Sequence, residues 1–214
     1  MRKGKFIVFE GGDGSGKNTQ IELLKSKLPK NTVYVREPGG TLKGEEIRSF
    51  LMSEESKGMS PKAEIFLFYT ARKYLLEEII KPALEKGYLV VSNRFSPSTF
   101  AYQIYGRRRL DLISLFKKKE KGMVGDWKPD ICLIFDVRPQ IALQRIKGRT
   151  RQELTRFDKE VLEFHRRVRN GYLAAVNILR YNMVIIDASQ SSEEIHKRVL
   201  EALKLEVLKN VPLL

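Results

Sequence analysis

The sequence predicts an α/β fold in which a five-stranded parallel sheet lies between two layers of helices. Five short runs of β-branched or apolar residues have the length of buried strands, and segments with helical spacing of apolar residues separate them. Because parallel strands need crossover segments, this alternation indicates a sheet covered on both faces. A chain of 214 residues suits one domain with its own core, so we expect residues 1–214 to form a single domain.

The five expected strands are short and rich in residues that favour sheets. The first reads Phe-Ile-Val-Phe, the last reads Met-Val-Ile-Ile, and the other three have the same character. We place these strands at residues 6–9, 32–35, 88–91, 131–135 and 183–186.

The segments between the strands carry apolar residues at helical spacing. Ser191 or Ser192, followed by Glu194, resembles the signal that caps a helix N-terminus, so a helix is expected to begin there. We expect helices at residues 17–28, 44–51, 61–86, 99–119, 139–146, 152–179 and 192–208.

Composition favours a cytoplasmic location. Hydrophobic residues make up 42% of the chain, but no apolar run approaches the roughly 20 residues that span a bilayer, so we expect no membrane partner. The N-terminus has no long apolar stretch of the kind that marks a signal peptide. Cys132 is the only cysteine and cannot pair internally, which is typical of a reducing compartment.

The formal net charge of +14 indicates an attraction for anions. The two longest basic runs, at residues 107–109 and 117–119, contain no interleaved aromatic residues that could stack on bases. We therefore expect small anionic ligands, and not nucleic acid, as partners.

Residues 11–19 read GGDGSGKNT and form the most informative motif of the chain. They follow an expected strand and open an expected helix, which is the context of a phosphate-binding loop. Glycines let successive backbone N–H groups point into one concavity, and the lysine adds a positive charge. Asn18 departs from the usual motif, because a Ser or Thr normally follows the lysine. The loop therefore predicts binding of a nucleoside triphosphate by Gly11, Gly12, Asp13, Gly14, Ser15, Gly16, Lys17, Asn18 and Thr19.

Two pairs of residues are candidates for binding a second ligand. Arg36 and Arg48 flank a Pro-Gly-Gly turn, and guanidinium groups grip phosphate oxygens in a fork. Phe68 and Arg72 are four residues apart in an expected helix, so they share a face that can stack on a base and hydrogen-bond to it. The residues alone leave alternatives open: a solvated surface turn for the first pair, and core packing for the second.

Together these motifs resemble the thymidylate kinase family of nucleoside monophosphate kinases. The resemblance is carried, in family order, by FEGGDGSGK, by REPGGT and the following GEEIR, by Phe68 and Arg72, and by segments 94–103 and 164–172. It implies the three-layer phosphate-loop fold of these kinases and transfer of the γ-phosphate of ATP to dTMP, with Mg²⁺ as cofactor. It also implies a homodimer, to which the long helix at 61–86 could contribute.

The resemblance assigns the phosphate and base of the acceptor to named residues. It implies that Arg48 holds the phosphate of dTMP and that Arg36 and Pro38 line its pocket. It implies that Phe68 stacks on thymine and that Arg72 donates a hydrogen bond to its O4.

The segment SNRFSPSTFAYQ resembles a further motif of the family. Arg94 matches the arginine that bridges the two phosphates, and Thr99 and Gln103 match positions near the base. Tyr102 matches a tyrosine that packs under the deoxyribose and leaves no room for a 2′-hydroxyl. By the same resemblance, Asp13 lies between the acceptor's 3′-hydroxyl and the phosphates or the metal shell.

A basic segment at about 145–156 matches the lid that closes over ATP in this family. One branch of the family has a catalytic arginine at the position of Gly14, and in the other branch the lid supplies it. Gly14 therefore implies a lid arginine, and we expect Arg149 first, then Arg145 and Arg151. The expected catalytic residues are Asp13, Lys17, Arg94 and Arg149, and Arg145 is a further expected ATP-binding residue.

Three residues depart from the family pattern. Asn18 and Asn93 replace a hydroxyl and an aspartate on the metal side of the site, so they are the metal candidates, and Thr155 replaces a later aspartate. The two asparagines leave open a nucleotide-binding paralogue with weak or no kinase activity. The basic charge leaves open a different phosphate-loop role that involves nucleic acid.

Overall fold

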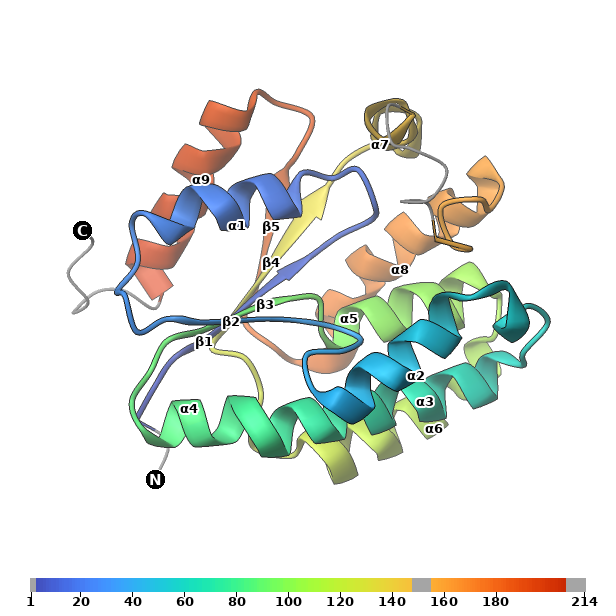
Figure 1. Cartoon of the computed structure of the whole chain (residues 1–214). Helices are drawn as coiled ribbons and strands as arrows, with labels where there is room; N and C mark the ends of the chain where they lie inside the picture. The colour runs from blue at the N-terminus through green and yellow to red at the C-terminus, as the bar shows by residue number, and fades with distance from the viewer. Residues whose placement is uncertain (1–2, 148–154, 207–214) are drawn as a thin grey trace.

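The computed structural model describes residues 3–147 and 155–206 and contains the expected parallel sheet (Figure 1). The strand order is β2-β3-β1-β4-β5, and each neighbouring pair runs parallel. All five strands lie within two residues of their predicted positions. They are β1 (Phe6–Glu10), β2 (Val33–Arg36), β3 (Val90–Asn93), β4 (Ile131–Asp136) and β5 (Met183–Asp187).

Helices cover both faces of the sheet, which confirms the predicted three layers (Figure 1). Helices α1 and α9 lie on one face, and α2 to α6 together with α8 lie on the other (Figure 1). The helices are α1 (Lys17–Lys25), α2 (Leu42–Met52), α3 (Pro61–Leu75), α4 (Lys81–Glu85), α5 (Ser96–Thr99), α6 (Ile113–Lys119), α7 (Pro139–Ile146), α8 (Leu162–Leu179) and α9 (Ser192–Glu206).

The central strand β1 supplies side chains to both cores, because successive side chains of a strand point to opposite faces. Phe6 and Val8 are buried with residues of α3, α4 and α8. Ile7 and Phe9 are buried with residues of α1 and α9. The apolar run that predicted this strand is therefore apolar throughout because both of its faces are covered.

Two predictions about helices are confirmed, one for a whole helix and one for a helix start. The helix expected at 61–86 is a continuous body made of α3, a π-helical turn at Leu76–Ile80, and α4. The Oγ atom of Ser191 accepts a hydrogen bond from Glu194 N at 3.2 Å, which is the predicted cap of α9.

The prediction of one helix over 99–119 is wrong. Helix α5 continues as a π-helical segment, Phe100–Gly106, and the chain then breaks at the run of three arginines before a short 3₁₀ turn, Leu110–Leu112, and α6. Arg108 has a φ of 56°, in the left-handed region that a right-handed helix cannot include.

The prediction that a helix begins at residue 152 is also wrong for the part that the structure describes, because α8 begins at Leu162. The carboxylate of Asp158 accepts hydrogen bonds from the backbone N and the hydroxyl of Thr155, both at 2.8 Å. Such side-chain bonds favour a turn over a helix. The turn at 155–158 brings this segment against the functional site.

Helix α8 packs closely against the Phe100–Gly106 segment, which carries the predicted site residues Tyr102 and Gln103. A Cβ at Gly171 would lie 2.7 Å from the Cβ of Tyr105 and 2.8 Å from the Cα of Ala101, so only glycine allows this approach.

Among residues 3–147 and 155–206, no helix is both long and apolar enough to cross a membrane.

Candidate active site

The phosphate-binding loop joins β1 to α1 at the carboxyl edge of the sheet, where open parallel sheets bind ligands. Gly14 and Gly16 have φ angles of 77° and 90°, which glycine adopts without steric cost. The ammonium group of Lys17 donates hydrogen bonds to the carbonyl oxygens of Gly11 and Gly12, both at 2.8 Å. The loop therefore holds its lysine inside the concavity that its backbone forms.

Gly14 packs directly against α7. A Cβ at this position would lie 2.2 Å from the carbonyl oxygen of Ala142 and 3.1 Å from its Cα. A side chain at position 14 therefore cannot be accommodated without moving α7, which excludes an arginine there in this arrangement.

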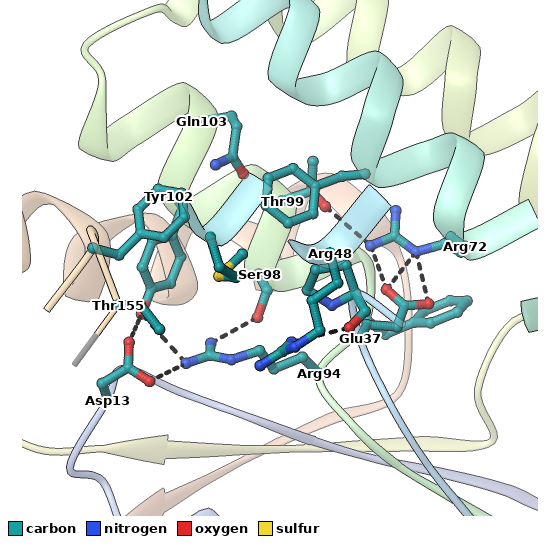
Figure 2. Close-up of a pocket in the computed structure, with 15 residues that line it drawn as sticks. Asp13, Glu37, Arg48, Arg72, Arg94, Ser98, Thr99, Tyr102, Gln103 and Thr155 are labelled. Atoms are coloured by element: carbon teal, nitrogen blue, oxygen red, sulfur yellow. Dashed lines mark hydrogen bonds and ion pairs between the residues drawn. The ribbon is translucent and has the colours of Figure 1, made fainter. Parts of the chain in front are cut away.

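Two cavities lie next to each other at this edge of the sheet. The first contains the predicted acceptor residues except Arg36, the second contains predicted ATP and metal residues, and Figure 2 shows the first. The first cavity is lined by Asp13, Glu37, Pro38, Arg48, Met52, Phe68, Arg72, Arg94, Phe95, Ser98, Thr99, Tyr102, Gln103, Thr155 and Phe157. The second is lined by Asp13, Gly14, Gly16, Lys17, Asn18, Thr19, Arg36, Glu37, Arg48, Asn93, Arg94, Arg145, Thr155 and Asp158.

Asp13 and Arg94 lie where the two cavities meet. Arg94 Nη2 donates to Asp13 Oδ1 at 2.7 Å, and the Tyr102 hydroxyl donates to Asp13 Oδ2 at 2.8 Å (Figure 2). Burial alone would raise the pKa of Asp13, but the nearby Arg94 guanidinium and Lys17 ammonium outweigh it and hold this pKa well below its usual value. Asp13 is therefore a carboxylate at neutral pH.

Arg94 has an uncommon backbone conformation, with a φ of 77° directly after β3. Its backbone N donates to the carbonyl oxygen of Phe9 at 2.9 Å, and its carbonyl oxygen accepts from the hydroxyl of Ser92 at 2.7 Å. These two bonds hold the backbone in this conformation, and the guanidinium is thereby directed to the junction of the two cavities.

Glu10 is a buried acidic residue close to Arg94. Its carboxylate is fully buried and accepts hydrogen bonds from Phe95 N and from the hydroxyl of Ser98, both at 2.6 Å. Burial raises the pKa of Glu10, although the bonds from Ser98 and Phe95 and the charge of Arg94 oppose that rise. Arg94 Nη1 in turn donates to the hydroxyls of Ser98 and Tyr172, at 3.0 and 2.8 Å.

Arg72 is fully buried at the wall of the first cavity, and two partners fix its guanidinium plane. Nε and Nη2 donate to the carboxylate of Glu37, the latter at 2.7 Å, and Nη2 also donates to the Thr99 hydroxyl at 3.0 Å (Figure 2). Within the part of the chain that the structure describes, Nη1 has no hydrogen-bond partner. Phe68, one helical turn away on α3, lines the same cavity, as predicted.

Gln103 lies at the other end of this wall (Figure 2). Its Nε2 donates to the buried carboxylate of Glu64 at 3.2 Å. Its Oε1 is buried and has no partner among the described residues. The wall therefore carries one unsatisfied donor, on Arg72, and one unsatisfied acceptor, on Gln103.

Two further arginines meet at the Pro-Gly-Gly turn. Arg48 donates to the carbonyl oxygen of Pro38 at 3.0 Å and lines both cavities. Arg36, which was predicted to line the acceptor pocket with Pro38, instead pairs with Glu45 at 2.9 Å and lines the second cavity and not the first. Arg36 Nη1 also lies 3.5 Å from the carbonyl oxygen of Pro38, so both guanidinium groups contact the turn.

Comparison with known proteins decides the family. The sequence profile of thymidylate kinase matches residues 9–199. The chain belongs to the thymidylate kinase family. It is 37% identical to thymidylate kinase of Maridesulfovibrio salexigens, over 96% of this chain and 99% of the relative. It is 41% identical to thymidylate kinase of Pelotomaculum thermopropionicum, over 94% and 93% of the two chains.

A crystal structure of thymidylate kinase from Ehrlichia chaffeensis is similar to most of the chain. It has a TM-score of 0.72 and 30% sequence identity, and the match covers 94% of this chain and 98% of the other. The predicted fold class is therefore confirmed, and this member of the thymidylate kinase family is a kinase.

Asn18 and Asn93, the two departures from the family pattern on the metal side of the site, lie in contact. Asn93 Nδ2 donates to Asn18 Oδ1 at 2.6 Å, and Asn93 Oδ1 is buried without a partner among the described residues. Over residues 3–147 and 155–206, no group of three His, Cys, Asp or Glu side chains has a metal-binding arrangement. The amide oxygens of Asn18 and Asn93 are neutral oxygens of a type that Mg²⁺ accepts, so these two residues fit the metal that the resemblance implies.

The lid prediction is only partly within the described structure. Arg145 lines the second cavity and donates to the carbonyl oxygen of Ala188 at 2.8 Å, in the turn after β5. Arg149, the first choice for the lid arginine, and Arg151 lie outside the described residues.

Sequence reasoning missed the acidic residues that hold the arginines. Glu10 and Glu37 are part of the motifs FEGG and REPGG but were not singled out, and Glu64 was not considered. For Glu10 and Glu37 the available signal was position, because a buried acidic residue at the end of a strand must find a cation or several donors.

Proposed function

We propose that this chain transfers the γ-phosphate of ATP to dTMP, giving ADP and dTDP. The observation that carries the proposal is the first cavity: it offers a base-reading wall at one end and opens at Arg94 into the cavity of the phosphate-binding loop. A base and a phosphate can therefore be held together, with the phosphate directed at the donor.

The wall fits the edge of thymine. Thymine presents an acceptor, O4, next to a donor, N3–H. Arg72 Nη1 is the unsatisfied donor and Gln103 Oε1 the unsatisfied acceptor, so their order matches that edge. Cytosine presents the reverse order, a donor at C4 and an acceptor at N3, and would leave both protein groups unsatisfied. Phe68 supplies a ring on the same wall for stacking.

The arginines of the site fit the two phosphates. Arg48 lines both cavities beside the Pro-Gly-Gly turn and would hold the acceptor phosphate, while Arg94 at the junction would bridge acceptor and donor. The acceptor phosphate has a second pKa of about 6, so it needs no general base at neutral pH. Alignment and positive charge are then the protein's main contribution.

Mg²⁺ bound to the donor phosphates would supply further positive charge to the transferring group. The chain's own candidates beside it are the amide oxygens of Asn18 and Asn93. Asp13 is already held by Arg94 and Tyr102, so its role would be to orient those two side chains toward the acceptor.

Three further features belong to the proposal. Segment 145–156 acts as the lid of the single domain, with Arg149 as its catalytic arginine. The exposed rings of Phe50 on α2 and Phe66 on α3 support a homodimer formed through these helices. The single cysteine, Cys132, is buried and free, which supports a cytoplasmic location.

A coupled assay of ADP release tests the proposal. The purified protein is given ATP, Mg²⁺ and one of dTMP, dUMP, dCMP, dGMP or the ribonucleotides. We expect dTMP to give the highest kcat/KM. The relatives compared above are kinases by name, so they favour activity over an inactive paralogue. Binding of dTMP without turnover, or preference for a purine, would contradict the proposal.

A further inference from the structure

Glu64 is a fully buried carboxylate on α3 with a partner on each oxygen. Arg156 Nη2 donates to Oε1 at 2.6 Å, and Gln103 Nε2 donates to Oε2 at 3.2 Å. The three side chains come from segments far apart in the sequence and are all nine-tenths or more buried. They form a chain of contacts that ends at the wall of the first cavity, which Gln103 lines.

Arg156 is anchored independently of Glu64. Its Nε donates to the carbonyl oxygen of Leu51 at 2.8 Å, near the end of α2, and its guanidinium lies 4.4 Å from the ring centroid of Phe157. Arg156 therefore presents a donor to Glu64 Oε1 in a fixed direction. A buried ion pair adds little net stability compared with apolar side chains in the same place. The pair formed by Arg156 and Glu64 therefore points to a role in substrate specificity.

The charge state of this cluster dictates how the Gln103 amide is turned. A carboxylate can only accept hydrogen bonds, so Gln103 must offer its NH₂ group to Glu64. The amide oxygen is then directed away from Glu64 and has no partner in the described part of the chain. In Figure 2 this oxygen lies on the Thr99 side of the amide, and Thr99 is the hydroxyl that contacts Arg72.

We propose that Glu64 and Arg156 are positioning residues that fix the orientation of the Gln103 amide and thereby set the preference for thymine over cytosine. Neither residue lines the cavity, so they act through Gln103 and not by contact with substrate. This inference rests on the proposed function, because it assumes that Gln103 faces the base of the acceptor.

The variant Glu64→Gln tests it with almost no change of volume. Arg156 would still take the oxygen of the new amide, which leaves the NH₂ group of that amide facing Gln103. The Gln103 amide must then turn over and present its NH₂ group to the base. Thymine would lose one of its two hydrogen bonds to the wall and cytosine would gain one. The preference for thymine over cytosine would therefore fall for both reasons.

The measurement is kcat/KM for dTMP and dCMP in the coupled assay, with melting temperature as a check on folding. We expect the dTMP-to-dCMP ratio to fall by about a hundredfold in Glu64→Gln, mainly through KM. The matched control is Glu54→Gln, which removes the exposed 2.7 Å pair with Lys159 in the segment that follows Arg156. The control should keep the ratio of the parent protein.

A second variant covers the case in which Glu64→Gln does not fold. The swap Glu64→Gln with Gln103→Glu restores one carboxylate and one amide in the cluster, and residue 103 again presents an acceptor to the base. We expect it to recover preference for dTMP. An unchanged ratio in folded Glu64→Gln, or loss of preference in the folded swap, would overturn the inference. If the parent protein itself shows no preference for dTMP, the proposed function fails instead.

Discussion

The two sides of this site are built in different ways. The donor side consists of the phosphate-binding loop, residues 11–19, with Asn93 and Arg145, and it is formed mainly by the backbone of one continuous segment. The acceptor side consists of Glu37, Phe68, Arg72, Thr99 and Gln103, and it is formed by side chains from three segments held by buried ion pairs and hydrogen bonds.

The difference follows from what each side must distinguish. Phosphate oxygens are alike in every nucleotide, so a nest of N–H groups and a lysine are sufficient on the donor side. A base edge is read by the order of donors and acceptors, and that order is useful only if the reading groups cannot rotate. The buried carboxylates Glu37 and Glu64 supply that constraint on the acceptor side.

The largest expected effect comes from Arg94, which lines both cavities and lies where they meet. Arg94→Met removes the charge at the junction and leaves Asp13 without its closest partner. We expect kcat/KM for dTMP to fall by about a thousandfold, mainly in kcat, because the lost interaction is with the transferring phosphate. Steady-state kinetics measure this. Arg109→Met, which breaks an exposed pair with Asp111, is the control and should change neither parameter.

A change confined to the acceptor side should affect only the acceptor. Arg72→Lys keeps a positive charge near Glu37 but loses the planar fork that reaches Glu37, Thr99 and the base. We expect KM for dTMP to rise by about a hundredfold while KM for ATP changes little. Equal changes in both constants would show that the two sides are not separate.

A change confined to the donor side should appear in the metal dependence. Asn93→Asp places a carboxylate beside Asn18, where the structure has two neutral amides. We expect the Mg²⁺ concentration for half-maximal activity to fall by roughly fivefold, with Asn18→Thr adding to the effect. Calorimetry with Mg²⁺-ADP gives a second measurement. If neither the Mg²⁺ dependence nor the calorimetry changes, Asn18 and Asn93 do not contribute to metal binding.

The smallest effect is a pH dependence on the acceptor side. Burial raises the pKa of Glu37 to about 7, although the charge of Arg72 opposes the rise. As the pH falls through this value, Glu37 gains a proton and loses an acceptor for Arg72. We expect binding of thymidine, which has no phosphate to titrate, to weaken roughly threefold between about pH 8 and pH 6. Glu37→Gln should bind thymidine with no such dependence.

The same contrast explains what the sequence could predict. The sheet and the phosphate-binding loop were predictable because each depends on a short continuous pattern. The acceptor residues came from the family resemblance, and the structure places Pro38, Arg48, Phe68, Arg72, Thr99, Tyr102 and Gln103 around one cavity.

The rest depends on contacts between distant segments. Glu64 and Arg156 are 92 positions apart and meet only when the turn at 155–158 packs against α2 and α3. The break at Arg108 depends on a backbone conformation that no residue type nearby required. Neither has a local pattern, so sequence reasoning placed helices through both regions.

If buried ion pairs and hydrogen bonds order the acceptor side, it should distinguish thymine from cytosine before any donor binds. Isothermal titration calorimetry of the protein with dTMP and with dCMP tests this most directly. Both titrations are done without ATP and with a chelator to remove Mg²⁺. We expect dTMP to bind under these conditions and dCMP to bind at least about a hundredfold more weakly. Equal affinity for the two nucleotides, or binding of dTMP only when a donor is present, would contradict it.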